Sequence, residues 1–181
     1  MKRSLLACGL LALCALPTFA HAADGHAFIA GDVGNSTIKV EGADGDDTAF
    51  RVRGGYFFNQ YVGVEAMYAN YGEDSDGGVS AKLDGYGVGL VVQAPIMKDS
   101  KVSVGARFGF AHHSVDASVA GLGSASVSDD ATYYGLGLGY DFTDKLRASI
   151  DWEQTSPKFD VGSQAYDVMV QTVTVGVQYR F

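Results

Sequence analysis

The sequence predicts an all-β protein that folds as an eight-stranded antiparallel up-and-down transmembrane β-barrel. Alternation of apolar and polar residues at period 2 recurs after residue 22, and this period is typical of strands with two chemically different faces. When each segment is sorted into odd and even positions, one face carries no charge at all. The links between segments are alternately long and short, as in outer-membrane barrels with long external loops and short periplasmic turns.

Eight segments carry this alternation, and they are expected at residues 27–36, 48–58, 61–71, 81–94, 101–113, 131–140, 146–154 and 166–181. The long links, expected as external loops, are residues 37–47, 72–80, 114–130 and 155–165. Short periplasmic turns are expected at residues 59–60, 95–100 and 141–145. Because loops run over the surface of a domain, we expect the long links to stay outside the barrel core.

The two faces of the segments differ in chemistry. The charged members of the polar face are Asp32, Arg51, Arg53, Glu65, Arg107, Arg147, Asp151, Glu153 and Arg180, separated by many glycines. A soluble sandwich or lipocalin-like barrel also alternates, but its water-facing side would not consist mostly of glycine. A membrane barrel explains the pattern, because a charge on the lipid face costs about 2–4 kcal/mol at the bilayer midplane. We therefore expect an interior polar core of Arg51, Arg53, Glu65, Arg107, Arg147, Asp151 and Glu153.

Residues 1–22 have the features of a secretory signal peptide, and residues 23–181 would form a single barrel domain. A basic start precedes an apolar stretch, and Ala20-His21-Ala22 is a small-x-small cleavage site. All 21 acidic residues lie after residue 22. The resulting excess of negative charge argues against nucleic-acid binding. Both cysteines lie in the leader, so the exported chain could form no thiolate metal site.

Residues 61–68 (YVGVEAMY) and 173–181 (VTVGVQYRF) resemble the small eight-stranded outer-membrane barrels of the OmpX/Ail type and the membrane half of OmpA. The resemblance implies a location in the cell outer membrane, in contact with outer-membrane lipid and lipopolysaccharide. The ending resembles the signal read by the barrel-assembly machinery, and its apolar residues are Val173, Val175, Val177, Tyr179 and Phe181. Biogenesis would then use that machinery and periplasmic chaperones.

The interior of an eight-stranded barrel is just filled by side chains. If the second hairpin is centred on Asn59, Arg53 lies opposite Glu65 and Phe57 lies opposite Tyr61, with both pairs pointing inward. The favoured interpretation is a structural polar core, because an unpaired buried charge is costly. A gate or proton path, and with it a narrow porin-like channel, is the alternative. We expect a monomer that needs no cofactor.

His112, His113 and Ser114 form the one local cluster that could be catalytic. Some small barrels modify lipid A by acyl chemistry, for which a His–Ser pair near the outer leaflet is suited. Adjacent strand residues alternate faces, so His113 should point inward while His112 and Ser114 point outward. This geometry disfavours both a His–Ser pair and a metal site that uses the two histidines. We therefore expect no enzyme and no catalytic, cofactor-binding or metal-binding residues, with a lipid A-modifying enzyme as the alternative.

The external links are acidic. They carry Glu41, Asp44, Asp46, Asp47, Glu73, Asp74, Asp76, Asp116, Asp129, Asp130 and Asp160 against Lys39 and Lys158. The carboxylates of these links would repel the phosphates of lipopolysaccharide unless divalent cations bridge the two. Residues 44–47 offer suitable oxygen ligands but lack complete calcium-loop spacing. Function concentrates in loops on a rigid scaffold. The sequence therefore predicts a structural or surface-interaction (adhesin-like) role, with an extracellular partner recognised by these links.

Overall fold

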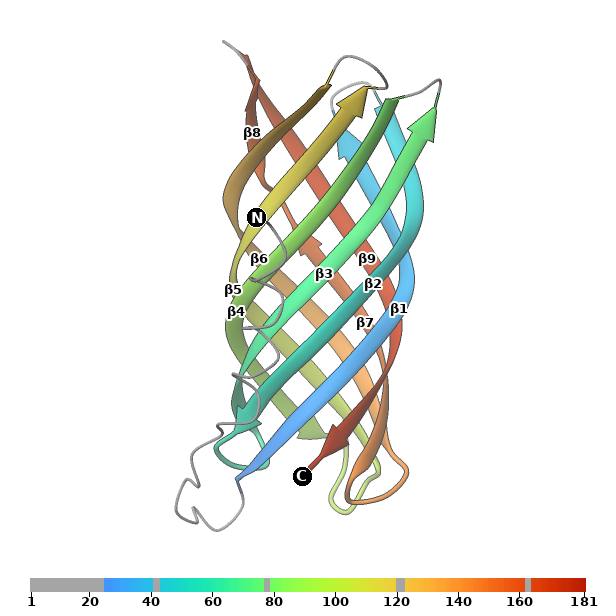
Figure 1. The fold of residues 1–181 in the computed structure, drawn as a ribbon. Coiled ribbons are helices and arrows are strands. Elements are labelled where there is room, and N and C mark those ends of the chain that lie inside the picture. Colours follow the sequence, from blue (N-terminus) through green and yellow to red (C-terminus); the bar gives the residue numbers. More distant parts are fainter. Residues whose placement is uncertain (1–24, 41–42, 77–78, 120–122, 162–163) are drawn as a thin grey trace, which may run out of the picture.

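The computed structural model describes residues 25–40, 43–76, 79–119, 123–161 and 164–181, so the expected signal peptide lies outside the described residues. The described chain forms a barrel of long, tilted antiparallel strands, with the C-terminus at the same end as the short turns (Figure 1). The strands are β1 (His26–Val40), β2 (Ala43–Phe57), β3 (Val62–Asp76), β4 (Val79–Pro95), β5 (Val102–Val119), β6 (Gly123–Asp141), β7 (Leu146–Thr155), β8 (Lys158–Val161) and β9 (Gln164–Arg180). None of the described residues forms a helix long and apolar enough to cross a membrane.

The sheet is closed by pairing between its first and last long strands. Each strand from β1 to β7 pairs with its sequence neighbour, β7 also pairs with β9, and β9 pairs with β1. The β1–β9 ladder runs from Phe28↔Arg180 to Val40↔Val168. Among the described strands β8 pairs only with β9, so eight strands make the barrel wall. The predicted eight-stranded antiparallel up-and-down barrel is confirmed, with β8 as an additional short strand.

The outer face of the wall is apolar. Phe110, Val88 and Leu136 are 64%, 63% and 62% exposed, and their neighbours along each strand face the interior. Aromatic side chains gather on this face near both ends of the barrel, including Tyr68 and Tyr86 at one end and Tyr140, Phe142 and Tyr179 at the other. An apolar band between two aromatic girdles is what a membrane barrel presents to lipid.

The short turn between β2 and β3 corrects the predicted register. Phe58 N donates to Val62 O at 2.9 Å. Asn59 Oδ1 accepts hydrogen bonds from the backbone N–H groups of Tyr61 and Val62. The turn is therefore centred on Gln60 and not on Asn59. As a result Arg53 lies opposite Met67, Glu65 opposite Gly55 and Phe57 opposite Gly63. Tyr61 is an exposed turn residue and not an inward partner of Phe57.

The prediction that the long links are loops is wrong for the described residues of these links except 156–157. β1 and β2 continue to Val40 and Ala43, and β5 and β6 continue to Val119 and Gly123. Beyond the membrane the inward residues of a strand can be small, as in residues 124–128 (SASVS), where serine alternates with Ala125 and Val127. The apolar alternation used to find strands therefore weakens there, although backbone pairing continues from Ser114↔Ser128 to Val119↔Gly123.

The external part of the wall divides into two sheets. Pairing between β2 and β3 stops at Phe50↔Asn70, and pairing between β6 and β7 stops at Tyr133↔Thr155. One external sheet consists of the ends of β3, β4, β5 and β6, and the other consists of β8 with the ends of β9, β1 and β2. Two seams without described backbone pairing separate these sheets.

A carboxylate bridges each seam. Asp47 Oδ2 accepts a hydrogen bond from Glu73 N at 2.7 Å across the β2/β3 seam. Asp129 Oδ2 accepts one from Lys158 N at 2.7 Å across the β6/β8 seam. Gly72, next to the first bridge, has a φ of 122°, and a Cβ at this position would collide with the Asp47 side chain. Side-chain acceptors thus take the place of backbone carbonyls at both seams.

Apolar side chains fill the space between the two external sheets. The buried members are Ala69, Tyr71, Leu83, Phe159, Val168 and Val170, with Ile38, Val115 and Val127 packed against them. Ile38, Val115, Val127 and Phe159 come from the predicted links, so the expectation that these links stay outside the core is wrong. Two facing sheets bury an apolar layer between them, which single loops could not do.

The bridge across the β2/β3 seam can be tested by hydrogen exchange. Asp47→Ala removes the acceptor of Glu73 N–H, so we expect this amide to exchange about tenfold faster or more, because a hydrogen bond to a charged group is worth about 1.5–3 kcal/mol. Asp46→Ala is the matched control, since among the described residues the Asp46 carboxylate accepts a hydrogen bond only from the Thr37 hydroxyl. Equal exchange at Glu73 in both variants would contradict the bridge.

Candidate functional site

Charged side chains from five strands meet inside the barrel. Asp32 lies on β1, Arg51 and Arg53 on β2, Glu65 on β3, Arg107 on β5, and Arg147, Asp151 and Glu153 on β7. Each stands between residues that face outward, so strand alternation directs it inward. Their exposed fractions are 9% or less. We call Asp32, Arg51, Arg53, Glu65, Arg107, Asp151 and Glu153 the charge cluster; Arg147 lies apart from it.

Asp32 is the most heavily engaged acid of the charge cluster. Arg53 Nε donates to Asp32 Oδ2 and Arg53 Nη2 to Asp32 Oδ1, both at 2.8 Å. Arg51 Nε donates to Asp32 Oδ2 at 3.1 Å. Two-pronged contact between a guanidinium and a carboxylate is the strongest geometry for such a pair. One buried carboxylate therefore holds the two arginines of β2.

The other acids share the same guanidinium groups. Arg51 Nη1 donates to Glu153 Oε2 at 2.6 Å, and Arg107 Nη2 donates to Asp151 Oδ1 at 3.1 Å. The Glu65 carboxylate lies 3.6 Å from Arg53 and 3.7 Å from Arg107. Arg53 and Glu65 thus approach each other from diagonal positions, although the register differs from the predicted one. In the charge cluster, three arginines thus form ion pairs with four carboxylates.

Tyr133 of β6 covers the charge cluster. Its side chain is fully buried, and its hydroxyl donates to Glu65 Oε1 at 3.4 Å. The ring lies over Gly89 and Gly109, where an added Cβ would collide with ring or hydroxyl atoms. The missing side chains of these glycines therefore make room for the tyrosine.

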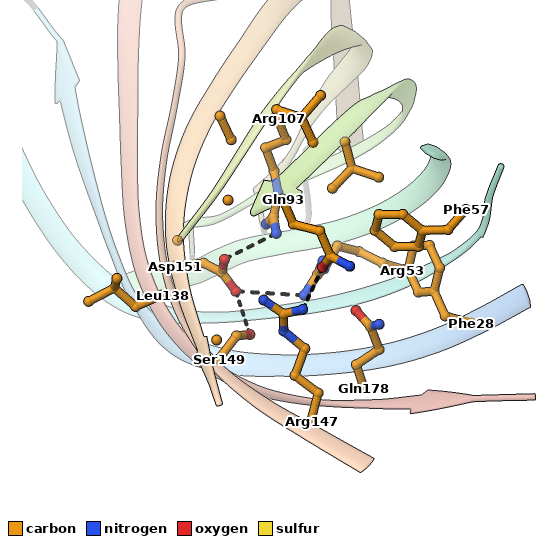
Figure 2. Close-up of a pocket in the computed structure, with 16 residues that line it drawn as sticks. Phe28, Arg53, Phe57, Gln93, Arg107, Leu138, Arg147, Ser149, Asp151 and Gln178 are labelled. Carbon is orange, nitrogen blue, oxygen red and sulfur yellow. Dashed lines mark hydrogen bonds and ion pairs between the residues drawn. The ribbon is translucent and has the colours of Figure 1, made fainter. Parts of the chain in front are cut away.

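Arg147 has neutral partners near the periplasmic end (Figure 2). Its Nη1 donates to Gln93 Oε1 and its Nη2 to Ser103 Oγ. Within the described ranges, no carboxylate oxygen lies within 4.0 Å of its guanidinium. Sequence reasoning missed Gln93 and Ser103, because uncharged residues leave only their position in the alternation as a signal.

The residues of the predicted histidine cluster lie on different faces. His113 is fully buried inside the barrel and its Nε2 lies 3.0 Å from Thr155 Oγ1. His112 faces outward, where its Nδ1 lies 2.7 Å from Asp130 Oδ1 and its ring packs against Tyr86. The part of the chain that the structure describes contains no group of three or more His, Cys, Asp or Glu residues that could hold a metal ion.

The fold is shared with known outer-membrane proteins. Residues 6–181 match the family described as outer membrane protein beta-barrel domain. The chain belongs to this family. Among solved structures, Ail, the attachment invasion locus protein of Yersinia pestis, is 23% identical with a TM-score of 0.65, over 87% of this chain and 99% of Ail. Neisserial surface protein A is 17% identical with a TM-score of 0.70, over 86% of this chain and 97% of its own. No curated protein matches the chain.

Membership of the outer membrane protein beta-barrel family confirms the family resemblance read from the sequence and the location in the cell outer membrane. A further solved barrel, OprG from Pseudomonas aeruginosa, is 15% identical with a TM-score of 0.55, over 87% of this chain and 96% of its own. At these identities the solved structures support the fold alone. The residues of the predicted assembly signal face outward on β9 and beyond it: Val173, Val175, Val177, Tyr179 and Phe181 are 55%, 55%, 55%, 41% and 69% exposed.

The charge cluster predicts unequal couplings to Arg53. Asp32→Ala should lower the free energy of unfolding by about 3–5 kcal/mol, because it leaves buried guanidinium groups uncompensated. In double-mutant cycles with Arg53→Ala, measured by urea unfolding in lipid, Asp32 should couple more strongly than Glu65. Asp32 forms two hydrogen bonds with Arg53, whereas Glu65 lies 3.6 Å away. Simple additivity for Asp32 would refute this arrangement.

Proposed function

We propose that this outer-membrane barrel acts as a rigid anchor that presents an acidic external surface to an extracellular partner, a surface-interaction (adhesin-like) role. The observation that carries the proposal is the charge of the external strand ends. Asp46, Glu73, Asp116, Asp130 and Asp167 are exposed there. Of the lysines that the structure describes at this end, Lys82 pairs with Asp84 and Lys158 with Asp167, which leaves only Lys39 without a described ion pair.

The partner is inferred to be cationic. Ail of Yersinia pestis has been crystallised with the heparin analogue sucrose octasulfate, so a barrel of similar fold can hold a sulfated sugar. A sulfated ligand does not suit the acidic external surface of this chain, because exposed carboxylates repel sulfate groups. Complementary charge raises the rate of association and selects against partners of the same sign. The barrel would contact the surrounding lipopolysaccharide in one of two ways: divalent cations would bridge its carboxylates to the lipid phosphates, or its outward aromatic side chains would pack against the lipid.

The alternative functions have less support. A narrow channel is disfavoured because the charge cluster joins opposite parts of the wall, with Arg51 of β2 held 2.6 Å from Glu153 of β7. The apolar layer between the external sheets lies beyond it. A lipid A-modifying enzyme is disfavoured because His113 is buried inside while Ser114 occupies the opposite face of β5. Catalysis by a His–Ser pair would require both on one face.

Assembly is proposed to depend on the end of β9. The series Val173, Val175, Val177, Tyr179 and Phe181 faces lipid, and such an alternating apolar ending suits recognition by the barrel-assembly machinery after periplasmic chaperones deliver the chain. Phe181 N donates to Ala27 O at 3.0 Å, next to the β1–β9 closure. The same residues would thus first be recognised by the assembly machinery and then lie beside the β1–β9 ladder that closes the barrel. A monomer is the expected state.

The charge of the external strand ends can be tested on intact cells. Glu73→Gln with Asp116→Asn should weaken binding of a fluorescent polylysine peptide, because two exposed carboxylates are lost from the external strand ends. The matched control, Asp99→Asn with Asp144→Asn, removes the same charge from exposed periplasmic turns. It should leave binding unchanged. Equal binding by both variants, or retention of heparin by the parent, would contradict the cationic partner; gel migration before and after boiling checks that each variant folds.

The assembly role of Phe181 has a separate test. Deleting Phe181 should reduce the yield of heat-modifiable barrel in outer membranes and leave misassembled chain in the periplasm. Phe142→Ala is the control, because it removes another exposed aromatic ring from the same end of the barrel. An undiminished barrel yield in the deletion strain would show that Phe181 is not part of the assembly signal.

A further inference from the structure

The outward face of β4, β5 and β6 changes chemistry where these strands leave the apolar band. Val88 and Phe110 lie opposite each other in that band, and both are exposed. Two residues further out, Tyr86 and His112 are the next outward pair. Beyond this pair the same face, which strand alternation defines, carries many small hydroxyl side chains. We call these residues the serine face: Ser80, Ser114, Ser118, Ser126 and Ser128.

Most hydroxyl groups of the serine face are free to bind a ligand. Ser80 Oγ and Ser118 Oγ form a hydrogen bond with each other at 2.8 Å. Ser114 and Ser128 lie directly opposite each other on β5 and β6. None of the described residues forms a side-chain hydrogen bond with these two hydroxyls or with that of Ser126. Since each hydroxyl can donate one hydrogen bond and accept two, the face offers both donors and acceptors on a flat surface.

An aromatic ring lies at the base of the serine face. Tyr86 is 61% exposed, and its ring centroid is 5.2 Å from that of His112. His112 Nδ1 lies in turn 2.7 Å from Asp130 Oδ1. The face of an aromatic ring carries partial negative charge and attracts positively polarised C–H groups. Tyr86 therefore offers a stacking surface next to the free hydroxyls.

The carboxylate beside this base is already paired. Asp84 Oδ1 accepts hydrogen bonds from the Tyr68 hydroxyl at 2.7 Å and from Asn70 Nδ2 at 2.9 Å. Asp84 Oδ2 lies 2.7 Å from Lys82 Nζ. With its charge matched in this way, the base of the face suits an uncharged polar ligand better than an ion.

The opposite side of the barrel uses its outward polar groups within the wall. Thr37 donates its hydroxyl hydrogen bond to Asp46 Oδ1 at 2.6 Å. Gln171 Nε2 donates to Gln154 Oε1 at 2.9 Å. The free hydroxyls of the serine face are therefore a feature of one side of the barrel.

We propose that the serine face binds the core sugars of an outer-leaflet lipopolysaccharide molecule whose acyl chains lie against Val88 and Phe110. A sugar ring has hydroxyl groups that donate and accept hydrogen bonds, and C–H groups that pack on an aromatic ring. The free serines and Tyr86 complement these two properties. The serine face continues the lipid-facing band outward, where the head groups of neighbouring lipids lie. The inference rests on the contact with lipopolysaccharide proposed above and needs no cationic partner.

The test compares two lipids by native mass spectrometry of the intact barrel in detergent. One is lipopolysaccharide with its core sugars, and the other is lipid A from which these sugars have been removed. The parent barrel should bind the first about tenfold more tightly than the second, because only the first reaches the hydroxyl groups. The preference should persist in EDTA, since contacts to hydroxyls need no divalent cation.

Two variants and a matched control locate the contact. Ser114→Val with Ser128→Val removes two opposed hydroxyls and keeps side chains that favour strands. It should reduce the preference for the core-bearing lipid about tenfold, because two hydrogen bonds are lost. Tyr86→Leu should also reduce it. The control, Asn35→Val with Thr48→Val, changes an opposed and exposed polar pair on β1 and β2 and should retain the preference.

The outcomes separate this site from other contacts with lipid. Equal binding of both lipids by the parent, a preference that is lost in EDTA, or a preference that persists in the double serine variant would overturn the proposal. Gel migration before and after boiling identifies folded barrel for each measurement. Polylysine binding by cells that carry Ser114→Val with Ser128→Val should equal that of the parent, so a failure of this proposal is distinguishable from a failure of the cationic partner.

Discussion

The ladder between β1 and β9 closes the sheet, and the other features of the barrel follow from that closure. Lipid offers no hydrogen bonds, so each backbone N–H and C=O in the membrane must find its partner within the protein. A sheet of eight strands meets this requirement only when its last strand returns to its first. Pairing from Phe28↔Arg180 to Val40↔Val168 accomplishes this, and it fixes which side chains face inward.

Closure confines every second side chain to a narrow interior. Charges there can persist only in compensating groups, because an isolated buried ion is far too costly. Arg53, for example, shares Asp32 with Arg51 and approaches Glu65 and Asp151. Glycines at positions such as 89 and 109 leave the volume that Tyr133 and the guanidinium groups occupy. Among the described residues compensation is incomplete in two places: the charge cluster has one more carboxylate than arginines, and Arg147 donates only to the neutral oxygens of Gln93 and Ser103.

The alternation of the sequence was enough to predict the strand number, the lipid face and the inward direction of the charged residues. It could not give their contacts, because the register depends on turn geometry. The side chain of Asn59 accepts two backbone hydrogen bonds, and the turn is centred one residue later than predicted. The residue opposite Arg53 on β3 is therefore Met67 and not Glu65. The external strand ends were missed for a different reason. Residues 124–128 alternate serine with Ala125 and Val127, and such small residues give only a weak apolar signal, so the segment resembles a loop.

Outside the membrane the requirement for a closed wall no longer applies, and the barrel opens into two sheets. Stability there comes from the apolar layer around Tyr71 and Phe159, and from two carboxylates that cross the seams. The acids of this region consequently divide into two groups. Asp47 and Asp129 accept hydrogen bonds from backbone N–H groups and shape the external end. The exposed side chains of Glu73 and Asp116 lie on either side of Lys82 and have no described hydrogen bond. The proposed cationic partner would therefore meet the second group of carboxylates, and the bridges that hold the two sheets together would stay in place.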